Sequence, residues 1–143
     1  MPTSEQQNLK TVKRFYEAAN EEMLKRTGNL NAILALMTDD IEWAPPVPEE
    51  RIRGRAEVER FVRFLLETLE FQIFQPDEFI VARDCIVVLG HERCRVPSTG
   101  RVVEAKWAQI HTLRHGLICR FREYTDTDAW KPAAAEMRAA ATN

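Results

Sequence analysis

The chain lacks the cysteine and histidine patterns that are typical of metal and redox sites. Its 143 residues include three cysteines and three histidines, with no Cys-x-x-Cys pair and no His-Glu-x-x-His segment. Cys85, Cys94 and Cys119 are odd in number and widely spaced, so we interpret them as small buried side chains in a reducing compartment. His111 and His115 are four residues apart, but on an expected strand and its turn rather than on one helical face. We therefore expect no metal ion and no cofactor.

The chain also lacks a charge excess and a long apolar run. Its formal net charge is −2, which gives no electrostatic reason to expect a nucleic-acid partner. No apolar run approaches membrane-spanning length, and the N-terminal segment MPTSEQQ has neither the basic nor the apolar region of a secretory signal. We expect a cytoplasmic protein without a membrane partner. The length and the hydrophobic fraction of 45% predict one domain over residues 1–143 with its own core.

Hydrophobic spacing predicts helices in the first half of the chain and strands in the second. The expected helices cover Ser4 to Arg26, with Thr3 or Ser4 as N-cap, then Asn31 to Met37 and Arg55 to about Leu69. The expected extended segments are 41–43, 71–74, 78–82 (after an interruption at Pro76-Asp77), 84–96, 101–113 and 117–125. The proline-rich stretch APPVPEER predicts a loop. An alanine-rich weak helix from about Pro132 makes 131–143 a weakly ordered tail.

The helices are separated from the strands along the chain, which indicates the α+β class. A curved antiparallel sheet needs its concave face covered, and three amphipathic helices are available to wrap it. Such an arrangement predicts a cone-shaped barrel with an open mouth, where a ligand pocket is expected.

The two glycine-ended turns predict which side chains share the inner face of the last three strands. Three-residue loops at Ser98-Thr99-Gly100 and Arg114-His115-Gly116 would place odd-numbered residues on one face. In this register Trp107 faces Glu123, and Arg93 faces Ala105. A two-residue loop at either turn would change the grouping. We interpret the even-numbered face, which includes Glu92, as solvated or as a wet interface.

The expected inner face carries polar and aromatic side chains that an ordinary core does not require. Glu123 is the candidate acid or base, and Arg93 is its partner or an anion clamp. A partly buried ion pair between these two residues that only stabilises the sheet is the alternative. The candidate substrate-binding residues are Tyr16, Trp43, His91, Trp107, Gln109, His111 and Phe121.

Four segments carry a resemblance to a known family. VKRFYEAAN, NLNAILALMTDDIEW, RIRGRAEVERFV and LICRFREYTDT occur in this order over nearly the whole chain. The chain resembles the NTF2-like superfamily, within it the SnoaL-like and ketosteroid-isomerase-like branch. The resemblance implies a cone-like α+β barrel and a homodimer formed through the sheet.

The catalytic sets of this superfamily match the chain only in part. Where ketosteroid isomerases have their base, tyrosine and protonated aspartate, this chain has Pro45, Phe15 (beside Tyr16) and Gln109. Of the Asp-Arg-Asp set of limonene-epoxide-hydrolase-like enzymes, the arginine matches Arg93 and the later aspartate matches Glu123. The earlier aspartate matches Arg95, so one carboxylate is missing. SnoaL-type cyclases use an aspartate and a histidine, roles that His91, His111 and Glu123 could fill without a position-by-position match.

Two functions remain open at this point. The first is a small-molecule pocket protein with acid–base chemistry, of the isomerase, cyclase, dehydratase or hydrolase type, on an apolar ring- or carbonyl-containing substrate. The second is a non-catalytic dimeric module that binds a ligand or serves as a scaffold. The missing carboxylates favour the second, and the polar inner face favours the first.

Overall fold

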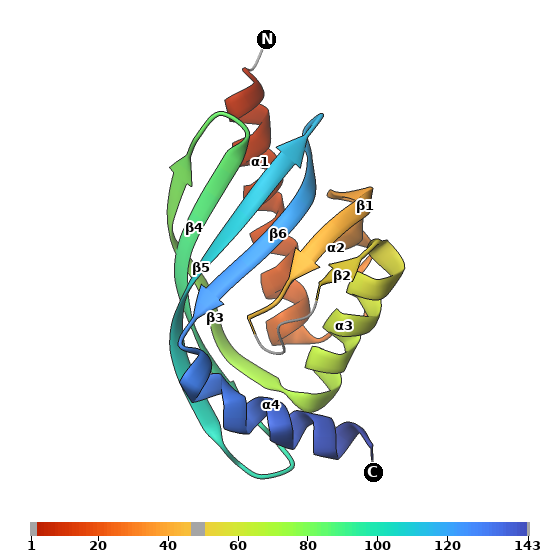
Figure 1. Cartoon of the computed structure of the whole chain (residues 1–143), viewed down its shortest axis with the longest axis vertical. Helices are drawn as coiled ribbons and strands as arrows, with labels where there is room; N and C mark the ends of the chain where they lie inside the picture. Colours follow the sequence, from red (N-terminus) through yellow and green to blue (C-terminus); the bar gives the residue numbers. More distant parts are fainter. Residues whose placement is uncertain (1–2, 47–50, 143) are drawn as a thin grey trace.

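The computed structural model describes residues 3–46 and 51–142, which form one curved six-stranded sheet and the helices that cover it (Figure 1). The helices are α1 (Ser4–Asn20), its π-helical continuation η1 (Glu21–Lys25), α2 (Asn31–Leu34), α3 (Arg55–Thr68) and α4 (Thr127–Ala141). The strands are β1 (Met37–Ala44), β2 (Ile52–Arg53), β3 (Glu70–Val81), β4 (Cys85–Arg95), β5 (Val102–Arg114) and β6 (Leu117–Thr125). The expected α+β class is confirmed.

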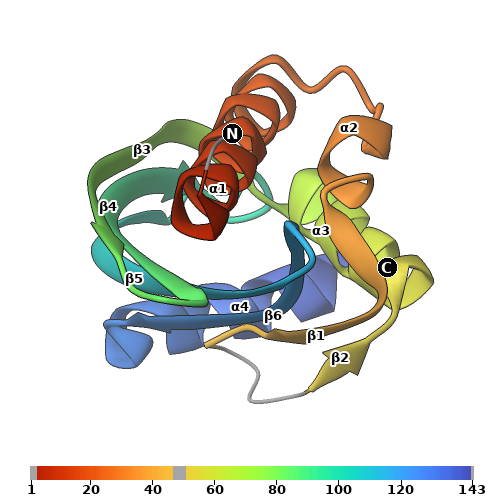
Figure 2. The ribbon, with the colours of Figure 1, turned by 90° about the horizontal axis from the view of Figure 1, so that it is seen from above.

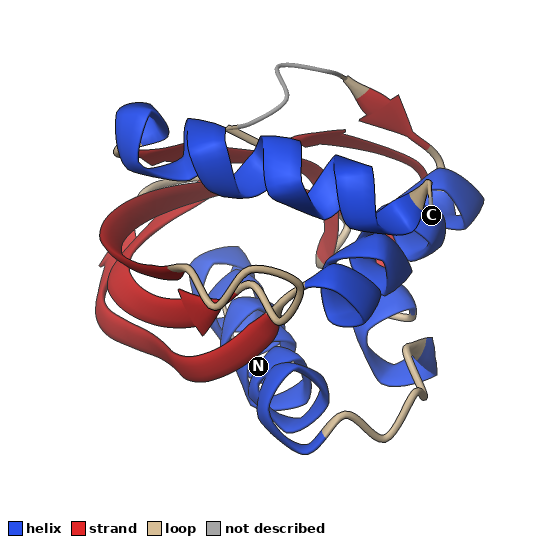
Figure 3. Ribbon diagram, turned by 90° about the horizontal axis from the view of Figure 1, so that it is seen from below, coloured by secondary structure: helices blue, strands red, loops and turns tan. Residues whose placement is uncertain are grey.

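The sheet has the order β2-β1-β6-β5-β4-β3. It is mixed rather than purely antiparallel, because β1 runs parallel to β6 while the other neighbours are antiparallel. Seen from above, the long strands curl around α1, and α3 lies beyond β1 on the open side (Figure 2). Seen from below, α4 crosses the opposite end of the cone and reaches α3 (Figure 3).

The first helix forms as its sequence predicts. Thr3 and Gln6 complete a capping box, which satisfies two backbone donors at the N-terminus. The chain leaves the helix after η1 at Arg26, whose φ of 57° is left-handed. One stripe of this helix is buried in the core: Val12, Phe15, Tyr16 and Ala19.

The C-terminal segment differs from the expected weak helix. Helix α4 begins at Thr127, five residues before Pro132, and Asp126 Oδ1 caps it by accepting from the Ala129 amide at 3.2 Å. Trp130 and Met137 are buried in a cluster with residues of β4 and β5. This packing gives the alanine-rich segment a stability that its local sequence does not provide.

Two other boundaries also differ. The second helix ends at Leu34, because Met37 already pairs with β6 as the start of β1. β3 is one continuous strand in which a bulge between Pro76 and Glu78 replaces the expected interruption. β3 lies at the sheet edge, where a proline without an amide hydrogen is tolerated. The expected proline-rich loop lies partly outside the described residues, at 47–50.

The expected register between β4 and β5 is wrong by one residue. The hairpin closes with the Val96 amide donating to the Arg101 carbonyl at 2.8 Å. The expected closing residue on β4 is Pro97, which has no amide hydrogen. Val96 therefore takes its place opposite Arg101, one residue earlier in the chain. His91 therefore pairs with Lys106, and Arg93 pairs with Glu104. A one-residue slip reverses both faces of a strand.

The expected face of β5 and β6 is right, although the partners differ. The second turn has two residues, His115 and Gly116, both with positive φ, as in the tight hairpins of antiparallel sheets. A bulge next to Ile118 then shifts the register by one more residue. Two shifts of one residue together return each side chain to its expected face. Gln109 therefore pairs with Glu123, and both side chains stay on the inner face.

Gly90 gives Trp107 its place on the inner face. A Cβ atom at residue 90 would lie 2.4 Å from the Gln75 carbonyl oxygen and 2.4 Å from the Trp107 ring. We expect Gly90→Ala to lower the free energy of unfolding by about 1–3 kcal/mol, as overpacking of cores does. Urea denaturation measures the loss, and Glu67→Gln on the exposed side of α3 is the control, with an expected change below about 0.5 kcal/mol. An unchanged Gly90→Ala variant would contradict this packing.

Candidate functional site

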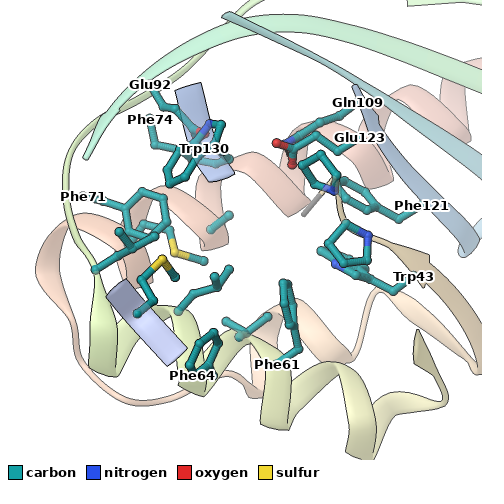
Figure 4. Close-up of a pocket in the computed structure, with 18 of the residues that line it drawn as sticks. Trp43, Phe61, Phe64, Phe71, Phe74, Glu92, Gln109, Phe121, Glu123 and Trp130 are labelled. Atoms are coloured by element: carbon teal, nitrogen blue, oxygen red, sulfur yellow. Dashed lines mark hydrogen bonds between the residues drawn. The ribbon is translucent and has the colours of Figure 1, made fainter. Parts of the chain in front are cut away.

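A cavity of about 120 Å³ lies between the inner face of the sheet and helices α1, α3 and α4 (Figure 4). Its volume is on the scale of an engineered protein cavity of ~150 Å³ that holds a benzene molecule. Aromatic side chains from six elements, α1, α3, α4, β1, β3 and β6, form most of the wall together with aliphatic residues and methionines. The aromatic lining residues are Phe15, Trp43, Phe61, Phe64, Phe71, Phe74, Phe121 and Trp130.

One end of this cavity is polar, and we call it the polar end. It consists of Glu92 from β4, Gln109 from β5 and Glu123 from β6; in the upper part of the close-up Glu92 lies on the left, and Gln109 and Glu123 lie side by side on the right (Figure 4). Gln109 Nε2 donates to Glu123 Oε1 at 2.9 Å. The curvature of the sheet turns all three side chains toward the aromatic wall. A ligand that fills the apolar part would therefore meet two carboxyl groups and one amide.

Glu123 is poised to exchange a proton near neutral pH. Burial raises the pKa of its carboxyl group from 4.5 to about 7, and the hydrogen bond from Gln109 opposes part of this shift. A carboxyl group whose pKa lies near 7 is present in both protonation states, as a general acid or base requires.

Glu92 completes the polar end, although its sequence position suggested a solvated residue. Only 7% of Glu92 is exposed, and its carboxyl group has no hydrogen-bond partner among the described residues. Burial and the negative charge of Glu123 both raise the pKa of Glu92 well above 4.5. The site thus holds two carboxyl groups, and burial favours the neutral form of each.

A buried cluster behind Gln109 fixes the orientation of its amide. The Tyr16 hydroxyl donates to Gln109 Oε1 at 2.6 Å and lies 2.7 Å from His111 Nε2. Burial lowers the pKa of His111 to about 3, so its ring is neutral. Because the single hydroxyl hydrogen of Tyr16 is directed at Gln109, the Nε2–H of His111 donates to Tyr16. The Gln109 oxygen is thereby held away from Glu123, and its NH₂ group toward it.

The structure separates the predicted aromatic residues into two groups. Trp43 and Phe121 line the cavity and stack on each other, with ring centroids 3.8 Å apart. Trp107 stacks on Tyr16 in the core, with ring centroids 5.9 Å apart. Trp107, Tyr16 and His111 all lie behind the residues that line the cavity. These three residues support the wall and the polar end without forming the cavity surface.

The expected neighbourhood of Glu123 and Arg93 is wrong, because the β4 register places Arg93 on the outer face. There it pairs with Glu104 and donates to Gln72 Oε1 at 2.7 Å. His91 lies on the same outer face, and its Nδ1 is 2.7 Å from Asp77 Oδ2. Neither residue reaches the cavity. Sequence reasoning missed Glu92, and Pro97 in the turn that follows β4 was the available signal.

The comparisons with known proteins agree on the fold. The model of the SnoaL-like domain matches residues 12–121. An NTF2-like protein from Burkholderia xenovorans LB400 is 30% identical, with a TM-score of 0.80 over 93% of this chain and 99% of that protein. A candidate polyketide cyclase from Xanthomonas campestris pv. campestris is 18% identical, with a TM-score of 0.75 over 92% and 99%. TerC, co-crystallised with polyporic acid, is 20% identical, with a TM-score of 0.74 over 90% and 98%.

No curated protein matches the sequence. No helix among residues 3–46 and 51–142 is long and apolar enough to cross a membrane. The family match, over residues 12–121, covers most of the chain. The chain belongs to the SnoaL-like family of the NTF2-like superfamily.

Proposed function

We propose that the cavity binds a small apolar, ring- or carbonyl-containing molecule and catalyses a proton transfer on it. The observation that carries the proposal is the pair of carboxyl groups, Glu92 and Glu123, at the polar end of a mostly apolar, aromatic cavity lining. Glu123 accepts the proton in its ionised form, and Glu92 donates one as a neutral acid. Gln109 anchors Glu123 and offers an amide to a substrate hydroxyl or carbonyl group.

The chemistry of the lining supports this assignment. Pockets for small molecules combine a mostly apolar wall with a few convergent polar groups, and groups with strongly shifted pKa values gather at such sites. Structural relatives carry names such as isomerase and polyketide cyclase, and TerC was crystallised with polyporic acid. These names favour ring compounds as the first substances to test.

The test first screens ring compounds for turnover by the parent protein. It then compares the kcat of Glu123→Gln with that of the parent on any compound that is turned over. We expect kcat to fall about a hundredfold, since general acid–base catalysis contributes at least this much, while binding of the compound persists. Glu67→Gln, on the exposed side of α3, should retain full turnover. A Glu123→Gln variant with parental kcat would refute the role of Glu123.

A non-catalytic dimeric module is the second candidate, and the outer face of the sheet favours it. Large apolar side chains on this face are exposed: Ile73, Ile80, Val102 and Tyr124. We propose a homodimer that forms through this face. We also propose that the protein is cytoplasmic, because a reducing compartment would keep Cys85, Cys94 and Cys119 free, as they are in this structure. Sedimentation equilibrium of the parent and of Tyr124→Glu tests the dimer, and a monomeric parent would refute it.

A further inference from the structure

We propose that the preferred ligand of the cavity is a small apolar amine in its protonated form, held with its ammonium group at the polar end and its ring against the aromatic wall. The inference rests on the proposed function in one respect, namely that the cavity is a ligand site. It goes further because it names the charge of the ligand.

The charges around the cavity favour a cation. Glu92 and Glu123 are its only acidic lining residues among residues 3–46 and 51–142, and none of the ion pairs in this part of the chain includes either of them. The one basic lining residue is Arg138, which is exposed on α4. A cationic ligand would supply the partner that the protein itself does not place there.

The hydrogen-bonding capacity of the polar end also fits an ammonium group. Glu92 is more than nine-tenths buried, lines the cavity and has no hydrogen-bond partner among the described side chains. Glu123 receives one hydrogen bond, from Gln109, and keeps further acceptor positions. An ammonium group carries three N–H donors and no acceptor, whereas a carboxylate ligand would add a negative charge without a donor.

The wall supplies the second element of cation recognition. The stacked pair of Trp43 and Phe121 lies at the same side of the cavity as Glu123, and Phe74 and Trp130 lie beside Glu92 (Figure 4). Ring faces attract cations, and sites for ammonium ligands combine such rings with carboxylates. The rings also bury the apolar part of the ligand, which an inorganic cation does not have.

Binding of the cation should release a proton. A positive charge near Glu92 and Glu123 lowers the pKa of both groups, so a carboxyl group that is protonated in the free protein loses its proton to the buffer. The other titratable groups around the site do not compete: burial holds the Tyr16 hydroxyl and the Cys94 thiol in their neutral forms, and His111 is neutral. Arg138, the one basic lining residue among those described, is exposed on α4.

Matched probes test this proposal on the full chain. Benzylamine, benzyl alcohol and benzoate have one ring and differ in their polar group, and the 2-naphthylmethyl amine and alcohol repeat the comparison with a larger ring. Titration calorimetry at pH 6 and pH 8, in phosphate and in a zwitterionic sulfonate buffer (Mes at pH 6, Hepes at pH 8), measures affinity and proton release. We expect each amine to bind at least tenfold more tightly than its alcohol at pH 8, with a smaller ratio at pH 6 and benzoate weakest.

Variants identify the groups responsible. Glu92→Gln and Glu123→Gln should each reduce the ratio of amine to alcohol affinity at least threefold and abolish part of the proton release, while circular dichroism confirms that both variants are folded. Glu67→Gln should keep the parental ratio.

The outcomes separate this proposal from the proposed function. Alcohols that bind as tightly as the amines, or benzoate that binds best, would overturn the amine preference and leave an acid–base site for neutral substrates. An amine preference that survives in both glutamine variants would also overturn it. If none of the five compounds binds, the amine site is refuted, and only turnover of a different compound that depends on Glu123 would keep the proposed function.

Discussion

A Glu123→Gln variant should be more stable than the parent protein at pH 8, by about 3 kcal/mol in the free energy of unfolding. The two proteins should be nearly equal at pH 4.5. Burial raises the pKa of Glu123 to about 7 in the folded state, against 4.5 for an ordinary glutamate. The variant keeps an acceptor oxygen for Gln109 and removes the ionisation, so it isolates the effect of the charge.

The sign follows from the number of bound protons. Between pH 4.5 and 7 the folded protein keeps a proton on Glu123 that the unfolded chain has released. The stability from this group is therefore fully present below pH 4.5 and is lost as the pH rises through 7. Glutamine at position 123 does not titrate, so the variant should escape this loss. The pKa of Glu92 is also raised, and it adds to the fall in the same direction.

Urea unfolding at pH 4.5, 6, 7 and 8 measures the difference, with Glu67→Gln as a surface control that should stay within about 0.5 kcal/mol of the parent throughout. A Glu123→Gln variant that is less stable than the parent at pH 8 would mean that a cation stabilises the carboxylate. That result would restore the ion-pair hypothesis with a partner other than Arg93, which is engaged with Glu104 on the outer face.

The sequence predicted the face of β5 and β6 but not that of β4, and the reason is the residue pattern of each strand. In β5, buried residues alternate regularly with less buried ones from Trp107 to Leu113. In β4 the run Ile86-Val87-Val88-Leu89 is apolar on both faces, so its pattern does not fix the register. The register then depended on the length of one turn.

One residue in that turn changed the composition of the site. The inner face carries Glu92 in place of His91 and Arg93. The expected site had one carboxylate paired with a cationic side chain, whereas the observed site has two carboxyl groups and no cationic partner for them. Similarly, α4 closes one end of the cavity through Trp130 and Met137, although its local sequence predicts only a weak helix. The order of α4 depends on long-range packing, which leaves no strong local signal, whereas the register of β4 depends on Pro97, a local signal in the turn.

Tyr16→Phe should lower the free energy of unfolding by about 2–4 kcal/mol, although it removes one oxygen atom. The hydroxyl group satisfies Gln109 Oε1 and the Nε2 of His111, both in the core. Each buried polar group that loses its partner costs about 1–3 kcal/mol. Phenylalanine keeps the stacking on Trp107, so no cavity contributes to the loss.

A double-mutant cycle separates the polar contribution from a general disturbance of the core. In a His111→Leu background, Tyr16→Phe leaves one unsatisfied group fewer, so we expect its cost to fall by about 1–3 kcal/mol. Glu67→Gln is the surface control, because Glu67 is exposed on α3, and it should cost less than about 0.5 kcal/mol in either background. Equal costs in the two backgrounds would show that Tyr16 and His111 are not coupled.

The same variant connects the core to the candidate site. Tyr16 orients Gln109 so that its NH₂ group faces Glu123, and this hydrogen bond lowers the pKa of Glu123. Without the hydroxyl group the amide is free to turn, so the pKa of Glu123 should rise above its parental value. The fall in the free energy of unfolding with rising pH should therefore occur at higher pH. The ascending limb of any pH–rate profile that depends on ionised Glu123 should move in the same direction. A pH dependence that stays in place while stability falls would mean that Tyr16 supports the core alone, and that Gln109 keeps its orientation through the sheet.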